Sequence, residues 1–144
     1  MNRFCPNCEE ETDQEFIKNS QVITVRGESI PVEAEYFLCK RCNGEYEEPR
    51  EGFDPLDQAY REFRRRKGML QPEEIKDQRK RLALTQKEFS IILGIGIATL
   101  NRYENGSLQS ESHDQTIRFA MDADHLREMI NNKRNKLPPK PLND

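Results

Sequence analysis

Four cysteines carry the clearest chemistry in this sequence, because they form two pairs with the same internal spacing. Cys5 and Cys8 make the first Cys-x-x-Cys pair, and Cys39 and Cys42 make the second, with 30 residues between the pairs. Such a turn places two thiolates on one side, and two turns brought together form a shell for one tetrahedral ion. The sequence therefore predicts one structural Zn²⁺ per chain. Four thiolates leave no open position for water, so this site is expected to be structural and not catalytic.

Three other interpretations of the cysteines stay open. Two disulfides are disfavoured in a reducing compartment, and the N-terminus lacks the apolar stretch of a signal peptide. A redox Cys-x-x-Cys is typical of a βαβ context, and an iron–sulfur cluster also uses four cysteines.

For the zinc site, Arg3, Lys40, Arg41 and backbone N–H groups are expected to offset the negative charge of the thiolates.

The residues between the cysteine pairs have the alternation of β-strands. Residues 21–26 are rich in β-formers, and residues 29–38 alternate apolar and polar side chains. The apolar face of the second stretch is Ile30, Val32, Ala34 and Tyr36. We expect a hairpin with its turn near Gly27 and Glu28, which returns the second cysteine pair to the first.

Composition indicates small modules. A chain of 144 residues fits one domain or two small ones, and with 34% hydrophobic residues and no Trp it cannot fill one large core. Residues 1–50 carry six Lys/Arg against eleven Asp/Glu, whereas residues 51–144 carry seventeen against fifteen. The cysteine-containing part is therefore acidic, and it is expected to be largely unfolded without its metal.

Helical signals begin after residue 50. Asp54 and Pro55 start a connector helix, whose stripe of Leu56, Tyr60 and Phe63 ends before a glycine at 68. Residues 61–67 hold five positive charges. They are interpreted either as a solvated helix end favoured by the helix dipole or as an arm that contacts phosphates.

The next segment has the pattern of consecutive short helices. Pro72 opens a helix that carries Ile75, Leu82 and Leu84, and Thr85 with Glu88 forms a capping box at the start of the next helix. That helix stops at a glycine, and residues 97–105 form a third, with two further helices near 111–121 and 124–135.

Residues 85–106 have the lengths and glycine turn of a helix-turn-helix, in which Leu100 and Tyr103 face inward. The side chains left outward are the candidate DNA contacts: Gln86, Ile97, Ala98, Asn101, Arg102 and Asn105. Gln86 at a helix N-terminus suits a phosphate, and the guanidinium of Arg102 matches guanine. Ile97 or Ala98 suits a thymine methyl group. An ordinary αα-hairpin remains the alternative.

The run from Thr85-Gln86 through Leu93-Gly94 to Arg102-Tyr103-Glu104-Asn105-Gly106 resembles the XRE, or lambda-repressor-like, helix-turn-helix family over about residues 70–130. Together with the two cysteine knuckles and Thr24-Val25-Arg26-Gly27, the chain resembles the MqsA antitoxin family, also called YgiT-type zinc finger/helix-turn-helix proteins. The resemblance implies a structural zinc domain and a dimeric repressor of palindromic operator DNA. In the family's namesake the N-terminal domain also neutralises an mRNA-cleaving toxin, so a toxin is a possible partner of this N-terminal domain. The family's DNA contacts fall on Ala98, where the family has an asparagine, and on Arg102.

We therefore expect a two-domain protein. A small β-hairpin domain with four cysteines around zinc spans 1–50, a connector helix 51–69, an all-α helix-turn-helix domain 70–135 and a flexible tail 136–144. Five apolar residues are candidates for a dimer surface or for the monomer core: Ile117, Ala120, Met121, Met129 and Ile130.

The expected function is that of a cytoplasmic, nucleoid-associated DNA-binding repressor. It is expected to be a homodimer, to act as an antitoxin and to have no contact with membranes. The alternative is a stand-alone regulator, which could respond to zinc. An enzyme is not expected, because His113 and His125 are isolated and no Ser/His/Asp set occurs.

Overall fold

The structure is a computed structural model that describes residues 1–48 and 53–138. The chain divides into two compact units, Met1–Phe63 and Arg64–Asp144. The division falls inside helix α1 (Pro55–Lys67), so the helix expected to be a connector contributes residues to both units. The expected boundary at residues 50 and 51 and the end of the expected tail (139–144) lie outside the described residues.

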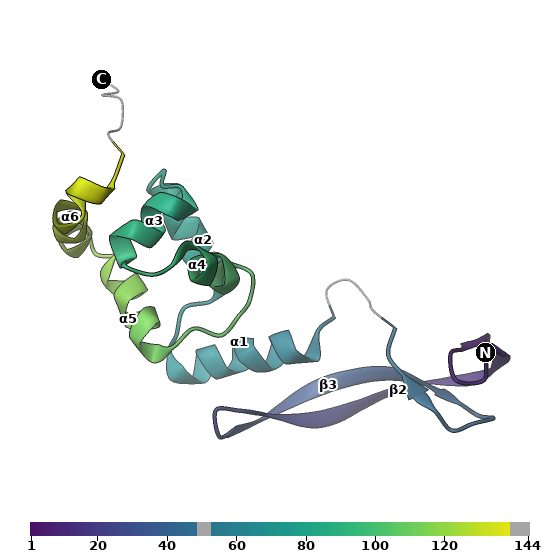
Figure 1. The fold of residues 1–144 in the computed structure, drawn as a ribbon. Helices are drawn as coiled ribbons and strands as arrows, with labels where there is room; N and C mark the ends of the chain where they lie inside the picture. Colours follow the sequence, from purple (N-terminus) through teal and green to yellow (C-terminus); the bar gives the residue numbers. More distant parts are fainter. Residues whose placement is uncertain (49–52, 139–144) are drawn as a thin grey trace. The chain divides into compact units, whose positions relative to one another are not determined.

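The first unit contains an antiparallel sheet in the order β1-β2-β3-β4 (Figure 1). The strands are β1 (Asn2–Cys5), β2 (Glu10–Val25), β3 (Glu28–Cys39) and β4 (Glu45–Tyr46). Strands β2 and β3 form the predicted hairpin, paired from Gln14 opposite Cys39 to Val25 opposite Glu28. The turn residues are Arg26 and Gly27, one position earlier than expected, with φ angles of 47° and 84°. Two consecutive positive φ angles characterise a tight two-residue hairpin turn.

One face of the hairpin forms the small core of this unit. Ile30, Val32 and Ala34 are buried, as their alternation predicts. Helix α1 adds Ala59 and Phe63 to the buried side chains of the unit, and its Gln58 Oε1 accepts a hydrogen bond from the backbone N–H of Glu33. The predicted helix stripe was wrong at one position. Leu56 is 47% exposed, whereas Phe63 is buried.

The second unit is helical. It contains the end of α1, then α2 (Pro72–Arg81), α3 (Gln86–Leu93), α4 (Ile97–Glu104), α5 (Glu111–Phe119), α6 (Ala123–Asn132) and the 3-10 turn η1 (Arg134–Lys136). Its core is formed by Leu70, Ile75, Phe89, Leu93, Ile95, Leu100, Tyr103, Ile117 and Ala120. Helix α2 ends three residues earlier than predicted, because Ala83 adopts a left-handed conformation that no helix interior tolerates.

The apolar residues of the last two helices mostly close this core. Ile117 and Ala120 are buried, and Met121 and Met129 pack against the same cluster. These four side chains therefore belong to the monomer core, which is one of the two interpretations given above. Ile130 is half-buried, so its burial assigns it neither to the monomer core nor to a dimer surface.

A buried arginine connects the C-terminal end of α1 to the rest of this unit through hydrogen bonds. The guanidinium of Arg64 donates to the carbonyls of Gly106 and Ser107, and to the side-chain oxygens of Gln109 and Gln71. Its side chain is fully buried. The two interpretations of residues 61–67, a solvated end or a phosphate arm, therefore both fail for Arg64, because its donors are used inside the protein.

Candidate metal centre and nucleic-acid interface

The two cysteine pairs lie in turns of the same geometry. In the first, the N–H of Glu9 donates to the carbonyl of Cys5, and in the second, the N–H of Asn43 donates to the carbonyl of Cys39, both over 2.8 Å. Glu9 and Asn43 share a left-handed φ of 58°. Each turn also directs a backbone N–H at a sulfur, from Cys8 to Cys5 Sγ and from Gly44 to Cys42 Sγ. Such turns present both thiolates of a pair to one point.

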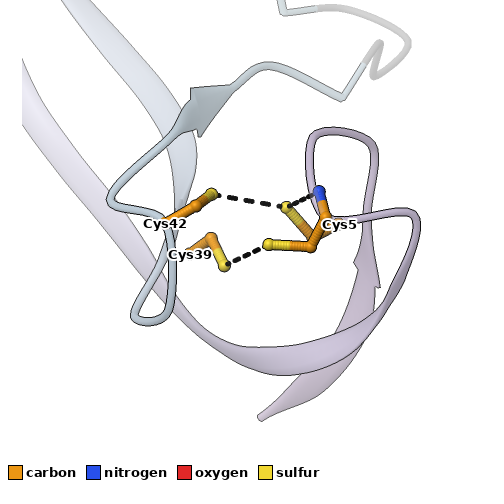
Figure 2. Close-up of side chains that lie close together, drawn as sticks. Cys5, Cys39 and Cys42 are labelled. Atoms are coloured by element: carbon orange, nitrogen blue, oxygen red, sulfur yellow. Dashed lines mark hydrogen bonds between the residues drawn. The ribbon is translucent and has the colours of Figure 1, made fainter.

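The hairpin brings the two turns together (Figure 2). The sulfur atoms of Cys5 and Cys42 lie 3.8 Å apart, those of Cys8 and Cys39 lie 3.9 Å apart, and all four lie within 4.8 Å of one another. Around a tetrahedral ion with zinc–sulfur bonds of about 2.3 Å, neighbouring sulfurs stand about 3.8 Å apart. The four cysteines are therefore placed to bind a metal ion as a closed set of sulfur ligands.

Hydrogen bonds and burial shift the pKa values of these thiols. The Thr12 hydroxyl, followed by backbone N–H groups, lowers the pKa of the Cys39 thiol to about 6. The side chain of Asn7 and the N–H of Gly44 lower the pKa of Cys42. Burial, followed by the neighbouring sulfurs, raises the pKa of Cys8 to about 12. Ionised thiolates are the form that binds metal, so the donors around Cys39 and Cys42 favour binding.

The expected role of the basic side chains near the cysteines was wrong. Arg3 pairs with Glu48, Lys40 with Asp13, and Arg41 with Glu10. Nearby carboxylates neutralise these cations, whereas the thiolates are stabilised by neutral donors. The backbone at Gly44 also lies close to the cluster, because a Cβ there would stand only 3.1 Å from the Cys42 sulfur.

In the second unit, α3 and α4 form a helix-turn-helix arrangement. Helix α3 begins with the predicted capping box of Thr85 and Glu88, and Gly94 ends it with a left-handed φ of 68°. Gly96 is the N-cap of α4. Leu100 and Tyr103 are buried in the core, which fixes the opposite face of α4 toward solvent.

The six predicted DNA contacts share this outer surface. Ile97, Ala98, Asn101, Arg102 and Asn105 are exposed, and Gln86 is half-buried beside them. Gln86 Nε2 donates to Asn101 Oδ1 over 3.2 Å, and Asn105 Nδ2 donates to the same oxygen over 3.2 Å. Within residues 1–48 and 53–138, Arg102 donates only to Thr99 Oγ1, from Nη2 over 3.3 Å, and its side chain is exposed.

An ion pair beneath this surface was missed in the sequence. The guanidinium of Arg79 on α2 makes a bidentate contact with the carboxylate of Glu104 on α4, with a closest distance of 2.9 Å. The Glu104 side chain is 2% exposed, and Arg79 also donates to the carbonyl of Leu84. This pair fixes the C-terminal end of α4. Charged residues usually lie at the surface, and these two are 25 residues apart. No local sequence pattern therefore indicates the pair.

These features define a class of protein: a β module with a four-cysteine metal site, followed by a helical domain with helix-turn-helix geometry. The chain belongs to the MqsA family, the antitoxin component of a bacterial toxin-antitoxin system, whose family model matches residues 3–120. It is also similar to antitoxin MqsA of Escherichia coli strain K12, with 43% identity over 60 residues. That match covers 42% of this chain and 44% of the relative's length. Within the described residues, no helix has both the length and the apolarity needed to cross a bilayer.

Proposed function

We propose that this protein is an antitoxin that represses transcription by binding operator DNA through α3 and α4. The observation that carries the proposal is the exposed surface of α4, which presents Asn101 and Arg102 while Leu100 and Tyr103 anchor the helix from behind. A helix held in this way by a helix-turn-helix can enter the major groove and read bases with its outward side chains. Membership in the MqsA family supports the antitoxin role.

Each candidate contact has a role that suits its geometry. Arg102 carries the two-pronged donor that matches the O6 and N7 atoms of guanine. Both hydrogen bonds to Asn101 Oδ1 come from protein groups, so its Nδ2 is the group turned to DNA, where it donates to a base or phosphate acceptor. Ile97 and Ala98 offer apolar contacts to thymine methyl groups. Gln86, the first residue of α3, holds the Asn101 side chain in place.

In this proposal the bound metal is Zn²⁺, held by Cys5, Cys8, Cys39 and Cys42. The sulfur separations near 3.8 Å and the absence of other ligand types in the cluster support that choice. Zinc bound in this way stabilises the fold of the first unit, because a ligand that binds only the folded state adds its binding free energy to folding.

The first unit is proposed to bind a protein partner, a toxin of basic surface, and not DNA. Its acidic residues outnumber its basic ones, which disfavours contact with phosphates. Phe4, Phe16 and Val22 expose 59%, 41% and 65% of their surface on the same unit. Exposed aromatic side chains are enriched at protein-binding surfaces. The chain acts in the cytoplasm as a homodimer, because two recognition helices spaced by one DNA turn read a palindrome.

Footprinting tests the DNA-binding part of the proposal. The full metal-loaded chain is titrated onto the DNA that precedes its own reading frame and onto unrelated DNA of equal length. Protection of a palindromic segment at concentrations that leave the unrelated duplex unprotected is the expected result. Equal protection of both duplexes would remove the repressor role.

The second candidate function is a stand-alone regulator without a toxin. Co-purification with the product of the neighbouring reading frame separates the two. A basic protein that stays bound to the wild type, and is released by Phe16→Asp or Val22→Asp, supports the antitoxin role. A zinc-responsive regulator requires in addition that chelation changes the affinity for DNA.

A further inference from the structure

A hollow lies at the turn between α3 and α4, beside the proposed DNA surface. Its volume is about 430 Å³, and the residues that line it include Gly94, Ile95 and Gly96 of the turn. The first residue of α4, Ile97, lines the hollow and is also one of the exposed residues proposed to contact DNA. The hollow and the DNA surface are therefore neighbours on the same unit.

Three lysines surround this hollow. Lys87 comes from α3, Lys133 follows α6, and Lys136 ends the 3-10 turn η1. The ammonium group of Lys133 lies over the turn, 4.0 Å from the position that a Cβ on Gly94 would occupy. The C-terminal segment thus adds two positive charges to a surface that α3 and α4 build.

The lysines around the hollow differ from two lysines of the first unit that have carboxylate partners. Lys18 and Lys40 in the first unit pair with Glu35 and Asp13. Within residues 1–48 and 53–138, no carboxylate pairs with Lys87, Lys133 or Lys136. Like charges gathered without a counter-charge repel one another, and a bound anion removes that repulsion.

The backbone of the turn adds to the attraction for an anion. Gly96 caps α4 without a side-chain hydrogen bond, so the first N–H groups of the helix have no cap from that residue. The positive end of the α4 dipole therefore lies at the hollow that the lysines surround. Both features favour negative charge at one place.

We propose that Lys87, Lys133 and Lys136 bind the phosphate backbone of DNA beside the major groove that α4 enters. This inference rests on the proposed DNA-binding function and extends the interface to the C-terminal segment. The family model ends at residue 120, so Lys133 and Lys136 lie beyond the part of the chain that it matches. Phosphate contacts of this kind set affinity and orientation and carry no sequence information.

The dependence of DNA affinity on salt tests this inference. The variants are Lys87→Gln and the double variant Lys133→Gln with Lys136→Gln, prepared as the full metal-loaded chain. Arg127→Gln is the matched control, because it removes one positive charge from the same C-terminal segment and Arg127 does not line the hollow. Affinities are measured over a range of salt concentrations, on the footprinted duplex and on unrelated DNA.

Each lysine that contacts a phosphate contributes about 0.9 to the slope of log affinity against log salt. The expected result is a slope smaller by about that amount per lysine removed, with affinity weakened by a similar factor on both duplexes. Slopes equal to that of Arg127→Gln would overturn the inference, including the case in which an acidic protein occupies the hollow instead. If the wild type binds no duplex at all, the proposed function itself fails, which is a distinct outcome.

Discussion

The hydroxyl oxygen of Thr12 lies 3.0 Å from the sulfur of Cys39, and both side chains are buried. On its other side this hydroxyl accepts a hydrogen bond from Gln14 Nε2 over 2.6 Å. A metal-bound thiolate can only accept hydrogen bonds, so the Thr12 O–H must donate to the sulfur while the Gln14 amide holds its oxygen. Two residues of β2 thus orient one of the four sulfur ligands.

Loss of this hydroxyl should weaken metal retention. Thr12→Val keeps the shape of the side chain and removes the donor, and outer-shell changes of this kind typically cost about 10- to 100-fold in metal affinity. Competition with a zinc chelator measures the change. Thr12→Ser should behave like the wild type, and Thr24→Val, on the exposed part of the same strand, should have no effect. Equal affinity of Thr12→Val and Thr24→Val would contradict this role.

The same hydrogen bond should set how the site responds to acid. Because Thr12 lowers the pKa of Cys39, this thiolate stays ionised to a lower pH, and the stabilisation it gives is lost as the pH falls through about 6. Without the donor the pKa rises toward 9.0, so release of metal should begin at a higher pH in Thr12→Val than in the wild type. A dye that reports free zinc follows the release. Identical release curves would show that the hydroxyl has no electrostatic effect.

Removal of the metal should unfold the first unit and spare the second. The β module has a small core, whereas the helical unit has its own buried cluster. Limited proteolysis of the chelated protein should cleave within residues 1–48 and leave a fragment that contains α2–α6. A β module that resists proteolysis after complete chelation would show that the metal is not required for its fold.

The ion pair between Arg79 and Glu104 should be important for stability. Removing one partner of a buried pair typically costs about 3–5 kcal/mol, because the other charge stays buried without compensation. Glu104→Ala should lower the free energy of unfolding of the helical unit by about that amount, as measured by urea denaturation. Glu128→Ala, at an exposed position of α6, is the control and should change it by less than about 0.5 kcal/mol. Similar midpoints for the two variants would refute this expectation.

Arg64 should contribute to the stability of the helical unit and not to its affinity for DNA. Arg64→Ala leaves the carbonyls of Gly106 and Ser107 without a buried donor, at a cost of about 1–3 kcal/mol for each unsatisfied group. The melting temperature of the helical unit is the measurement. Arg66→Ala, at an exposed position of the same helix, is the comparison. A larger loss of stability in Arg66→Ala would mean that the buried contacts of Arg64 are not what fastens α1.

Local sequence signals predicted the elements around both sites. The cysteine spacing, the alternation of residues 29–38 and the capping box at Thr85 each specify backbone geometry within a few residues. Strand β2 was expected only over 21–26 and begins at Glu10. Its first half is polar, and it is extended because β1 pairs with residues 10–13 and β3 with residues 14–25.

Long-range polar contacts could not be predicted in this way. Arg64 and Glu104 have charged side chains, which usually lie at the surface, and their burial depends on partners 25 to 45 residues away. The cations beside the cysteines were misassigned for the same reason, since their carboxylate partners are distant in the sequence. Periodicity reports which face is buried, but not which polar groups meet there.

Arg102 is proposed to read a base from the exposed surface of α4, and titration of operator DNA measures this contact. Wild type, Arg102→Ala and the control Arg127→Ala are each titrated onto the footprinted duplex and onto duplexes with single guanine replacements. Arg102→Ala is expected to lose about 1–3 kcal/mol of binding free energy, roughly 5- to 150-fold in affinity, on the footprinted duplex and no longer to distinguish one guanine from its replacement. Arg102→Ala with the affinity and base preference of the wild type would contradict it.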